Sequence, residues 1–146
     1  MRDTNSGPSA GIKLENGLTV YFQDRSKPLA GDRWQVKLDI VIPIRILPEY
    51  FSECSDPTEA YAEAVAAFGE VVEFRQERVR HFVDERDRAA VREKMERDFR
   101  ESVLAYASRP KFAESCVLKR YKAYNEKQGI RRAYVEALSN NRREDE

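Results

Sequence analysis

Residues 33–46 read RWQVKLDIVIPIRI, and every even position from Trp34 to Ile46 is apolar. Polar residues such as Arg33, Lys37 and Asp39 lie among the odd positions. Side chains of a β-strand point alternately to its two faces, so the pattern predicts one long strand with a continuous apolar face. The rest of the chain must supply strands beside this one and helices to cover that face.

A β-hairpin is predicted just before this strand, over residues 12–22. The dipeptide Asn16-Gly17 is a strong signal for a tight turn. A two-residue loop would put the apolar residues of the two arms on opposite faces. A three-residue loop ending at a left-handed Gly17 instead pairs Leu14 with Leu18 and joins the apolar faces, so we expect the longer loop.

The segment between the hairpin and the long strand, residues 25–32, is predicted to be a polar connection that contains Pro28 and Gly31. It makes the three N-terminal strands an antiparallel meander. Pro43 has no N–H to donate, so it should mark the point where pairing ends along one edge of the long strand.

A helix is predicted to begin at Asp56-Pro57, because aspartate is a good N-cap and proline is favoured at the first helical position. Apolar residues then recur at helical spacing up to Phe68, and Gly69 is a suitable terminator.

Residues 70–83 fit two interpretations. As a strand, the segment alternates, but its apolar residues change phase and require a bulge near Gln76. As a continuation of the preceding helix, it would form a seam with alternating spacings of four and three. We favour the strand because Gly69 interrupts the helix and Arg75 would lie in that seam.

Two further long helices are predicted. The first covers residues 84–107, with Val91, Met95 and Phe99 along its inner face, and ends before Pro110. The second covers residues 111–128 and ends at Gly129. Residues 130–138 then form a last short helix.

The order of these elements predicts an α+β fold: an antiparallel sheet of about four strands, made of the N-terminal meander and one later strand, covered on one face by three or four helices. We expect one domain at residues 11–139, between a flexible N-terminal tail (1–10) and a disordered C-terminal tail (140–146).

Charges cancel over the whole chain, with 26 basic and 26 acidic residues, but they are segregated. Residues 49–108 carry 9 basic and 15 acidic side chains, whereas residues 109–132 have a net charge of +6. Lysine and arginine on a helix can neutralise phosphates, and tyrosine can stack on bases. The candidate positions for binding nucleic acid or another anion are Lys111, Lys119, Arg120, Lys122, Lys127, Arg131 and Arg132.

No pattern in the sequence predicts catalysis. His81 is the single histidine, and no nucleophile motif accompanies it, so we expect a structural or surface residue. Cys54 and Cys116 are far apart and lack the spacing of a metal site or redox pair. There is also no phosphate-binding or dinucleotide-binding glycine motif, and we expect no cofactor and no metal.

The polar connection is a candidate ligand-binding loop, because rigid strands flank it. Its candidate residues are Asp24, Arg25, Ser26, Lys27, Asp32 and Arg33. Asp24 and Ser26 match part of the Asp-x-Ser-x-x-Gly element of PilZ domains, but Gly31 falls two residues late and the preceding Arg-x-x-x-Arg is missing. We favour a turn held by the Asp and Ser side chains.

Three segments, residues 14–18, 29–34 and 81–84, together resemble a family of small bacterial proteins whose function is uncharacterised. The resemblance implies no activity. It supports a strand at residues 70–83.

We therefore expect a non-enzymatic, cytoplasmic domain for protein interaction or assembly, whose partner is another protein or a second copy. An open sheet leaves edges, and Tyr21, Val41 and Leu47 add apolar groups to its nominally polar face. The alternative is a nucleic-acid-binding module that uses the basic C-terminal helices. No segment is apolar enough to predict a membrane span or a signal peptide.

Overall fold

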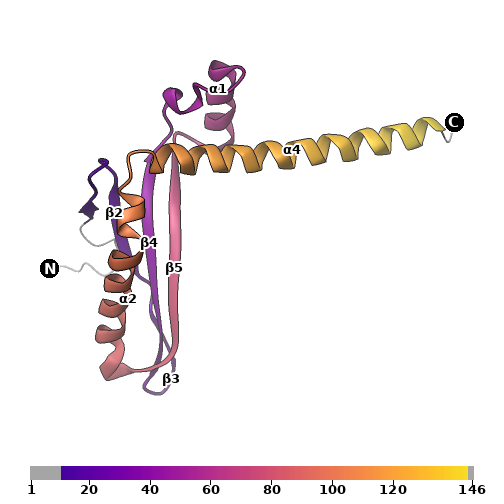
Figure 1. Ribbon diagram of the computed structural model, residues 1–146. Coiled ribbons are helices and arrows are strands. Elements are labelled where there is room, and N and C mark those ends of the chain that lie inside the picture. The colour runs from indigo at the N-terminus through magenta and orange to yellow at the C-terminus, as the bar shows by residue number, and fades with distance from the viewer. Residues whose placement is uncertain (1–10, 145–146) are drawn as a thin grey trace.

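The computed structural model describes residues 11–144 and has an α+β fold, as the sequence predicts (Figure 1). The expected tail at residues 1–10 lies outside the described residues. The strands are β1 (Ile12–Lys13), β2 (Thr19–Asp24), β3 (Lys27–Ala30), β4 (Arg33–Arg45) and β5 (Val71–Asp84). The α-helices are α1 (Pro57–Phe68), α2 (Arg88–Ser102), α3 (Leu104–Ala107) and α4 (Phe112–Glu144), with 3-10 turns η2 (Pro48–Phe51) and η3 (Glu85–Asp87).

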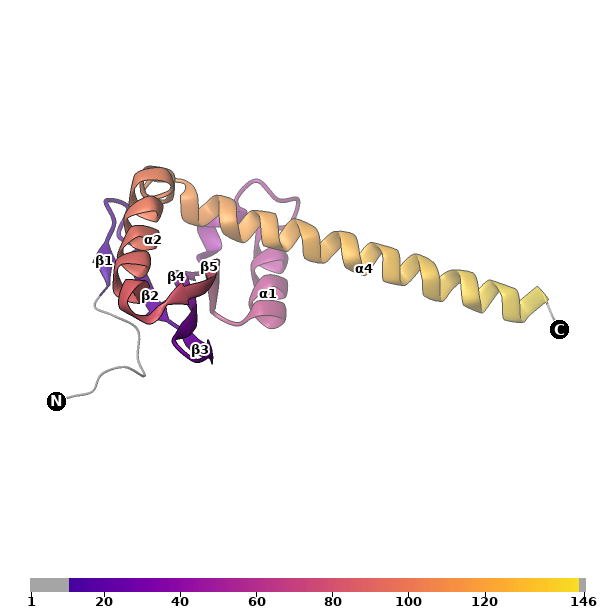
Figure 2. The same ribbon diagram turned by 90° about the horizontal axis from the view of Figure 1, so that it is seen from below.

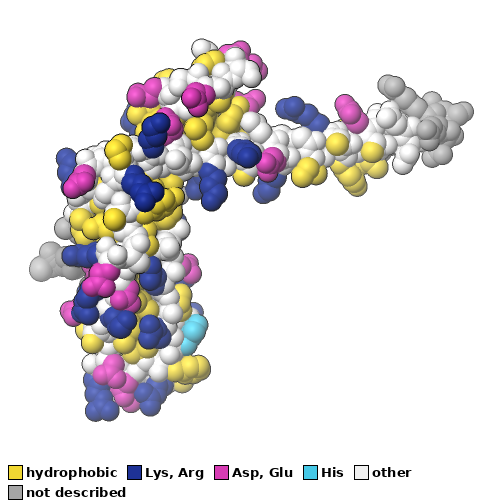
Figure 3. Space-filling model, viewed as in Figure 1, with side chains coloured by type: hydrophobic (Ala, Val, Ile, Leu, Met, Phe, Trp, Pro, Cys, Tyr) yellow, Lys and Arg dark blue, Asp and Glu magenta, His cyan; other side chains and the backbone are white. Residues whose placement is uncertain are grey.

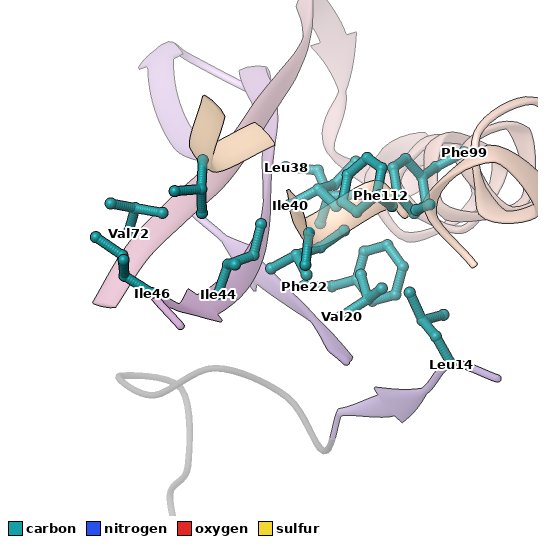
Figure 4. Packing of buried hydrophobic residues seen from close by; sticks show 14 of the residues in the cluster. Leu14, Val20, Phe22, Leu38, Ile40, Ile44, Ile46, Val72, Phe99 and Phe112 are labelled. Carbon is teal, nitrogen blue, oxygen red and sulfur yellow. The ribbon is translucent and has the colours of Figure 1, made fainter. Parts of the chain in front are cut away.

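Strand β4 is the centre of the fold. Its even-numbered side chains form the apolar face that the sequence predicts, and those of Leu38, Ile40 and Ile42 are completely buried. Trp34, at the start of the strand, is only partly buried and lies under the guanidinium of Arg88, 3.9 Å from the ring centroid. Figure 4 shows the side chains that pack around this face.

Within residues 11–144 the sheet has five strands, all antiparallel to their neighbours. Strand β5 follows one edge of β4 from Arg33 to Arg45. Strand β2 pairs with the other edge only up to Val41, so the pairing along that edge ends before Pro43, as expected.

The segment predicted to be a plain connection contains a strand. At Lys27 and Pro28, β3 pairs with β4 in the same register as β2, and only Arg25 and Ser26 interrupt the two strands. The register then shifts by one residue before Ala30. Arg25 N still donates to Lys37 O (2.9 Å), so the ladder continues across the interruption. The prediction of a loop over residues 25–32 was wrong because β-pairing with a long neighbour outweighs a low intrinsic β-propensity.

The N-terminal hairpin has the three-residue loop that the apolar pattern predicts. Leu14 N donates to Leu18 O (2.7 Å), and Gly17 has a φ of 91°. Asn16 adds a contact that the sequence did not reveal: its Nδ2 donates to Ala107 O and Arg109 O, both at 2.8 Å. The Asn16 side chain therefore ties the hairpin to the C-terminal end of α3.

Strand β5 confirms the preferred interpretation of residues 70–83, but the bulge is not near Gln76. The register shifts further along, where His81 and Phe82 lie opposite the single residue Gln35. Phe82 has a φ of 57° at this point. The extra residue turns Val83 inward, where its side chain is 7% exposed.

The face of β4 predicted to be polar contains a buried charge. Asp39 is 3% exposed, and its carboxylate forms ion pairs with Arg25, which lies between β2 and β3, and with Arg75 of β5. Val41 on the same face is also buried, at 9% exposure.

Helix α1 forms as expected: the Asp56 side chain accepts a hydrogen bond from Glu59 N (3.2 Å), and the helix ends at Gly69. The helix expected over residues 84–107 is instead broken at Val103, which separates α2 from α3. Ser102 Oγ donates to Asp98 O (2.6 Å) just before the break, a contact that bends helices.

The C-terminal segment is one helix rather than two. α4 has 33 residues and passes through Gly129. Glycine ends a helix readily when its φ is positive, and Gly129 is not among the residues with positive φ. The residues around it are strong helix formers, which outweigh the roughly 1 kcal/mol that a mid-helix glycine costs. The helix also extends to Glu144, into the tail expected to be disordered.

Helices α2 and α4 lie on the same side of the sheet (Figure 2). Phe99 of α2 packs edge-on against Phe22 of β2, with ring centroids 5.7 Å apart. Phe112 and Val117 anchor the first turns of α4 in the same core. The rest of α4 projects from this body, as Figure 1 shows.

Replacement of Asn16 tests the tie between the hairpin and α3. Asn16→Ala removes two donors to carbonyl groups at a helix end, and it should lower the free energy of unfolding by about 1–3 kcal/mol in denaturant titrations. Asn16→Asp should lower it further, because a carboxylate would face two carbonyl oxygens. The exposed Asn140→Ala is the control, and equal stability of Asn16→Ala and this control would contradict the role of Asn16.

Candidate interaction surface

The projecting part of α4 begins where its contacts with the body end. Tyr121 packs edge-on against Phe51 (centroids 5.5 Å apart) and donates its hydroxyl to Glu63 Oε1 (2.7 Å). Tyr124 packs against Phe68 of α1, with centroids 5.6 Å apart. Every residue from 129 to 141 is exposed, and we call this segment the arm.

The arm carries large apolar side chains that no other part of residues 11–144 covers. Ile130 is 72% exposed, Tyr134 66% and Leu138 46%. Their spacing of four residues aligns them along one side of the helix, and we call them the arm stripe. Val135, 58% exposed, lies next to it. Figure 3 shows hydrophobic side chains gathered along the lower edge of the projecting helix, on the side toward which the sheet extends.

A cleft of about 340 Å³ lies at the base of the arm, between α4, α3 and β5. Its walls are mostly apolar, and Lys119 and Arg120 add positive charge. Arg120 Nη2 donates to Glu73 O on β5 (2.8 Å), so this arginine holds α4 against the sheet. The other lining residues are Ile44, Val72, Phe74, Tyr106, Ser115, Cys116 and Ala123.

Cys116 lines this cleft as a free thiol. Burial raises the pKa of the thiol, and the positive charges of Arg120 and Lys119 act in the opposite direction. Burial dominates, so less thiolate is present at a given pH than in an exposed cysteine.

The basic residues predicted to bind nucleic acid are all exposed, but they do not form one face. Lys111 precedes α4, and Lys119 and Arg120 lie at the cleft. The other four, Lys122, Lys127, Arg131 and Arg132, follow the helix outward, where their spacing distributes them around its axis.

The candidate ligand loop is held together by its own contacts. Asp24 Oδ1 accepts from Ser26 N (2.9 Å), and Ser26 Oγ accepts from Lys37 N (3.1 Å). These side-chain contacts hold the interruption between β2 and β3 beside β4, but the chain continues along β4 here without reversing, so the expected turn was wrong. Arg25 pairs with Asp39.

The remaining loop residues lie at the β3–β4 end. Arg33 Nη1 lies 3.3 Å from Asp84 Oδ2 and its Nε lies 3.9 Å from Asp32 Oδ1. Lys27 is exposed on β3. The charged side chains of the loop thus pair with different neighbours and do not converge on one binding point.

His81 is exposed on the bulge of β5, where its Nδ1 lies 3.3 Å from Gln35 Nε2. No group of three or more His, Cys, Asp or Glu side chains could hold a metal ion in the part of the chain that the structure describes. Among these same residues, no helix combines the length and hydrophobicity needed to cross a bilayer.

Comparison with known proteins gives no match: no family model, no curated protein and no solved structure is similar to this chain. The resemblance to a bacterial family therefore stays a prediction. The arm and the cleft are the features on which a functional argument can be built.

The raised pKa of Cys116 predicts slow alkylation. In a Cys54→Ser variant, the rate of reaction with iodoacetamide should rise with pH as the Cys116 thiol ionises. The midpoint of this rise should lie at a higher pH than for an exposed thiol. Lys119→Gln should move this midpoint higher still, because a cation that favours the thiolate is lost while the contact of Arg120 with β5 is kept. Lys122→Gln is the matched control and should leave it unchanged. A midpoint below that of a free cysteine, measured by mass spectrometry of the alkylated protein, would contradict this prediction.

Proposed function

We propose that this protein is a non-enzymatic domain for protein interaction and assembly, and that the arm of α4 is its docking element. The observation that carries the proposal is the arm stripe: three large apolar side chains aligned on a helix that leaves the body. Covering a fully exposed Ile or Leu side chain is favourable by about 1.5–3 kcal/mol. A partner that covers the stripe therefore gains free energy that the isolated chain does not.

The cleft at the base of the arm supports the same proposal. Cys116 and Ala123 of α4 line it, so the cleft and the arm belong to one helix. Exposed apolar patches with polar surroundings are typical of interaction sites. The proposed partner is a second copy of the chain.

We also propose that the protein acts in the cytoplasm. Cys54 and Cys116 are free thiols, which suits a reducing compartment. Both cysteines are only partly buried, so their thiols would remain open to oxidation in an oxidising compartment.

Self-association is tested by sedimentation over a concentration series. The average mass of the wild type should rise above the 17.0 kDa of one chain as concentration increases. Ile130→Ser combined with Leu138→Ser removes most of the stripe and should keep the mass at that of one chain. Arg132→Ser combined with Glu136→Ser, on another side of the arm, is the control and should still associate. A wild type that stays monomeric at every concentration would contradict the proposed self-association.

The second candidate function is nucleic-acid binding. It is favoured by the exposure of Lys119, Lys122 and Lys127 together with the exposed ring of Tyr134 on one projecting helix. Such binding depends on neutralised phosphates and weakens steeply as salt is added. Apolar association through the stripe does not weaken in this way, so salt distinguishes the two functions.

The anisotropy of a fluorescent single-stranded RNA tests this second function. Binding at low salt should fall with salt, and replacing Lys119, Lys122 and Lys127 with Glu should abolish it. Arg120 is left in place because it holds α4 to β5. No anisotropy change at low salt would exclude nucleic-acid binding by α4.

A further inference from the structure

The arm stripe is symmetric in sequence about its middle residue. Ile130 precedes Tyr134 by four positions, and Leu138 follows it by four. Two such helices that pack antiparallel and cross at Tyr134 place Ile130 of each against Leu138 of the other. Both ends of the stripe are then covered by an apolar side chain of similar size.

We infer that the arm stripe is covered by the arm of a second copy, packed antiparallel about a two-fold axis at Tyr134. This inference rests on the proposed self-association and gives it a geometry. A two-fold arrangement uses the same surface on both copies and closes after two chains.

The charges beside the stripe favour the antiparallel orientation. In a parallel pair, Lys127 would lie beside Lys127 of the other copy, and Arg131 beside its own counterpart. In the antiparallel pair, Lys127 instead lies opposite the uncharged Asn141, and Arg131 lies opposite Ala137. The helix dipoles also oppose each other in this orientation.

The shape of the molecule favours the same orientation. Hydrophobic side chains gather along the lower edge of the arm in Figure 3. The sheet extends from α4 toward this same side in Figure 1. Packed helices have axes about 8–10 Å apart, which is less than the width of a body made of a sheet and its helices. Parallel arms would bring both bodies to the same end, where they would overlap, whereas antiparallel arms keep them at opposite ends.

The length of the arm sets the strength of the contact. Residues 129–141 span about 20 Å of helix at 1.5 Å per residue. Two helix segments of this length should bury less surface than the roughly 1,200 Å² that marks stable interfaces. The dimer should therefore form and dissociate reversibly.

Cysteine cross-linking tests this geometry in a full-length chain that carries Cys54→Ser and Cys116→Ser. Under mild oxidation, Tyr134→Cys should form a disulfide-linked dimer with twice the 17.0 kDa of one chain. Ile130→Cys and Leu138→Cys should each stay monomeric alone but should cross-link when the two variants are mixed. Glu136→Cys, on another side of the arm, is the control and should not cross-link in any mixture.

Three results would overturn the inference, and the first two leave self-association intact. If Ile130→Cys and Leu138→Cys each link to themselves, the arms are parallel. If the wild type dimerises but no stripe cysteine links, a different surface of the second copy covers the stripe. If an unrelated acidic helical peptide binds the stripe more tightly than the second copy does, the partner is another protein. A monomeric wild type in sedimentation is a separate outcome that removes the proposed self-association itself.

Discussion

The burial of one face of β4 is the interaction on which the rest of the structure depends. Leu38, Ile40 and Ile42 are completely buried, and they lie between a sheet and the helices that cover it. Strands β2 and β3 pair with one edge of β4, and β5 pairs with the other. Phe99 and Phe112 pack against its apolar face. Helix α2 and the first turns of α4 cover this face. Nothing in the described chain is left to cover the end of α4, and the arm is exposed for that reason.

Local sequence signals predicted much of the fold. The alternation of residues 33–46 gave the central strand, Asn16-Gly17 gave the hairpin with its register, and Asp56 gave the start of α1. These elements could be predicted because neighbouring residues contain the whole pattern. The missed features depend on distant partners. Strand β3 forms on Pro28 and other weak strand formers because β4 is beside it. The charge of Asp39 is buried beside Arg25 and Arg75, which are distant from it in sequence.

The candidate surface could be predicted only in part. Charge counting found the basic residues of the C-terminal segment, but it could not show that Arg120 would hold the helix to β5. The prediction ended one helix at Gly129 and began another after it. The arm stripe was therefore not recognised, because it becomes prominent only on a continuous projecting helix. The signal was present: Ile130, Tyr134 and Leu138 follow helical spacing, and none of the other described elements covers them. Interpreting this spacing as an exposed stripe required knowing that other elements already cover the core.

Hydrogen–deuterium exchange at two protein concentrations tests the central claim most directly, because the claim is that a rigid body carries a helix which only a partner covers. At low concentration the amides of β4 should exchange slowly, and those of residues 129–141 should exchange fast. At high concentration the protection of residues 129–141 should rise while that of the body stays the same. Strong protection of the arm at the lowest concentration, or protection that rises elsewhere but not in the arm, would contradict the account.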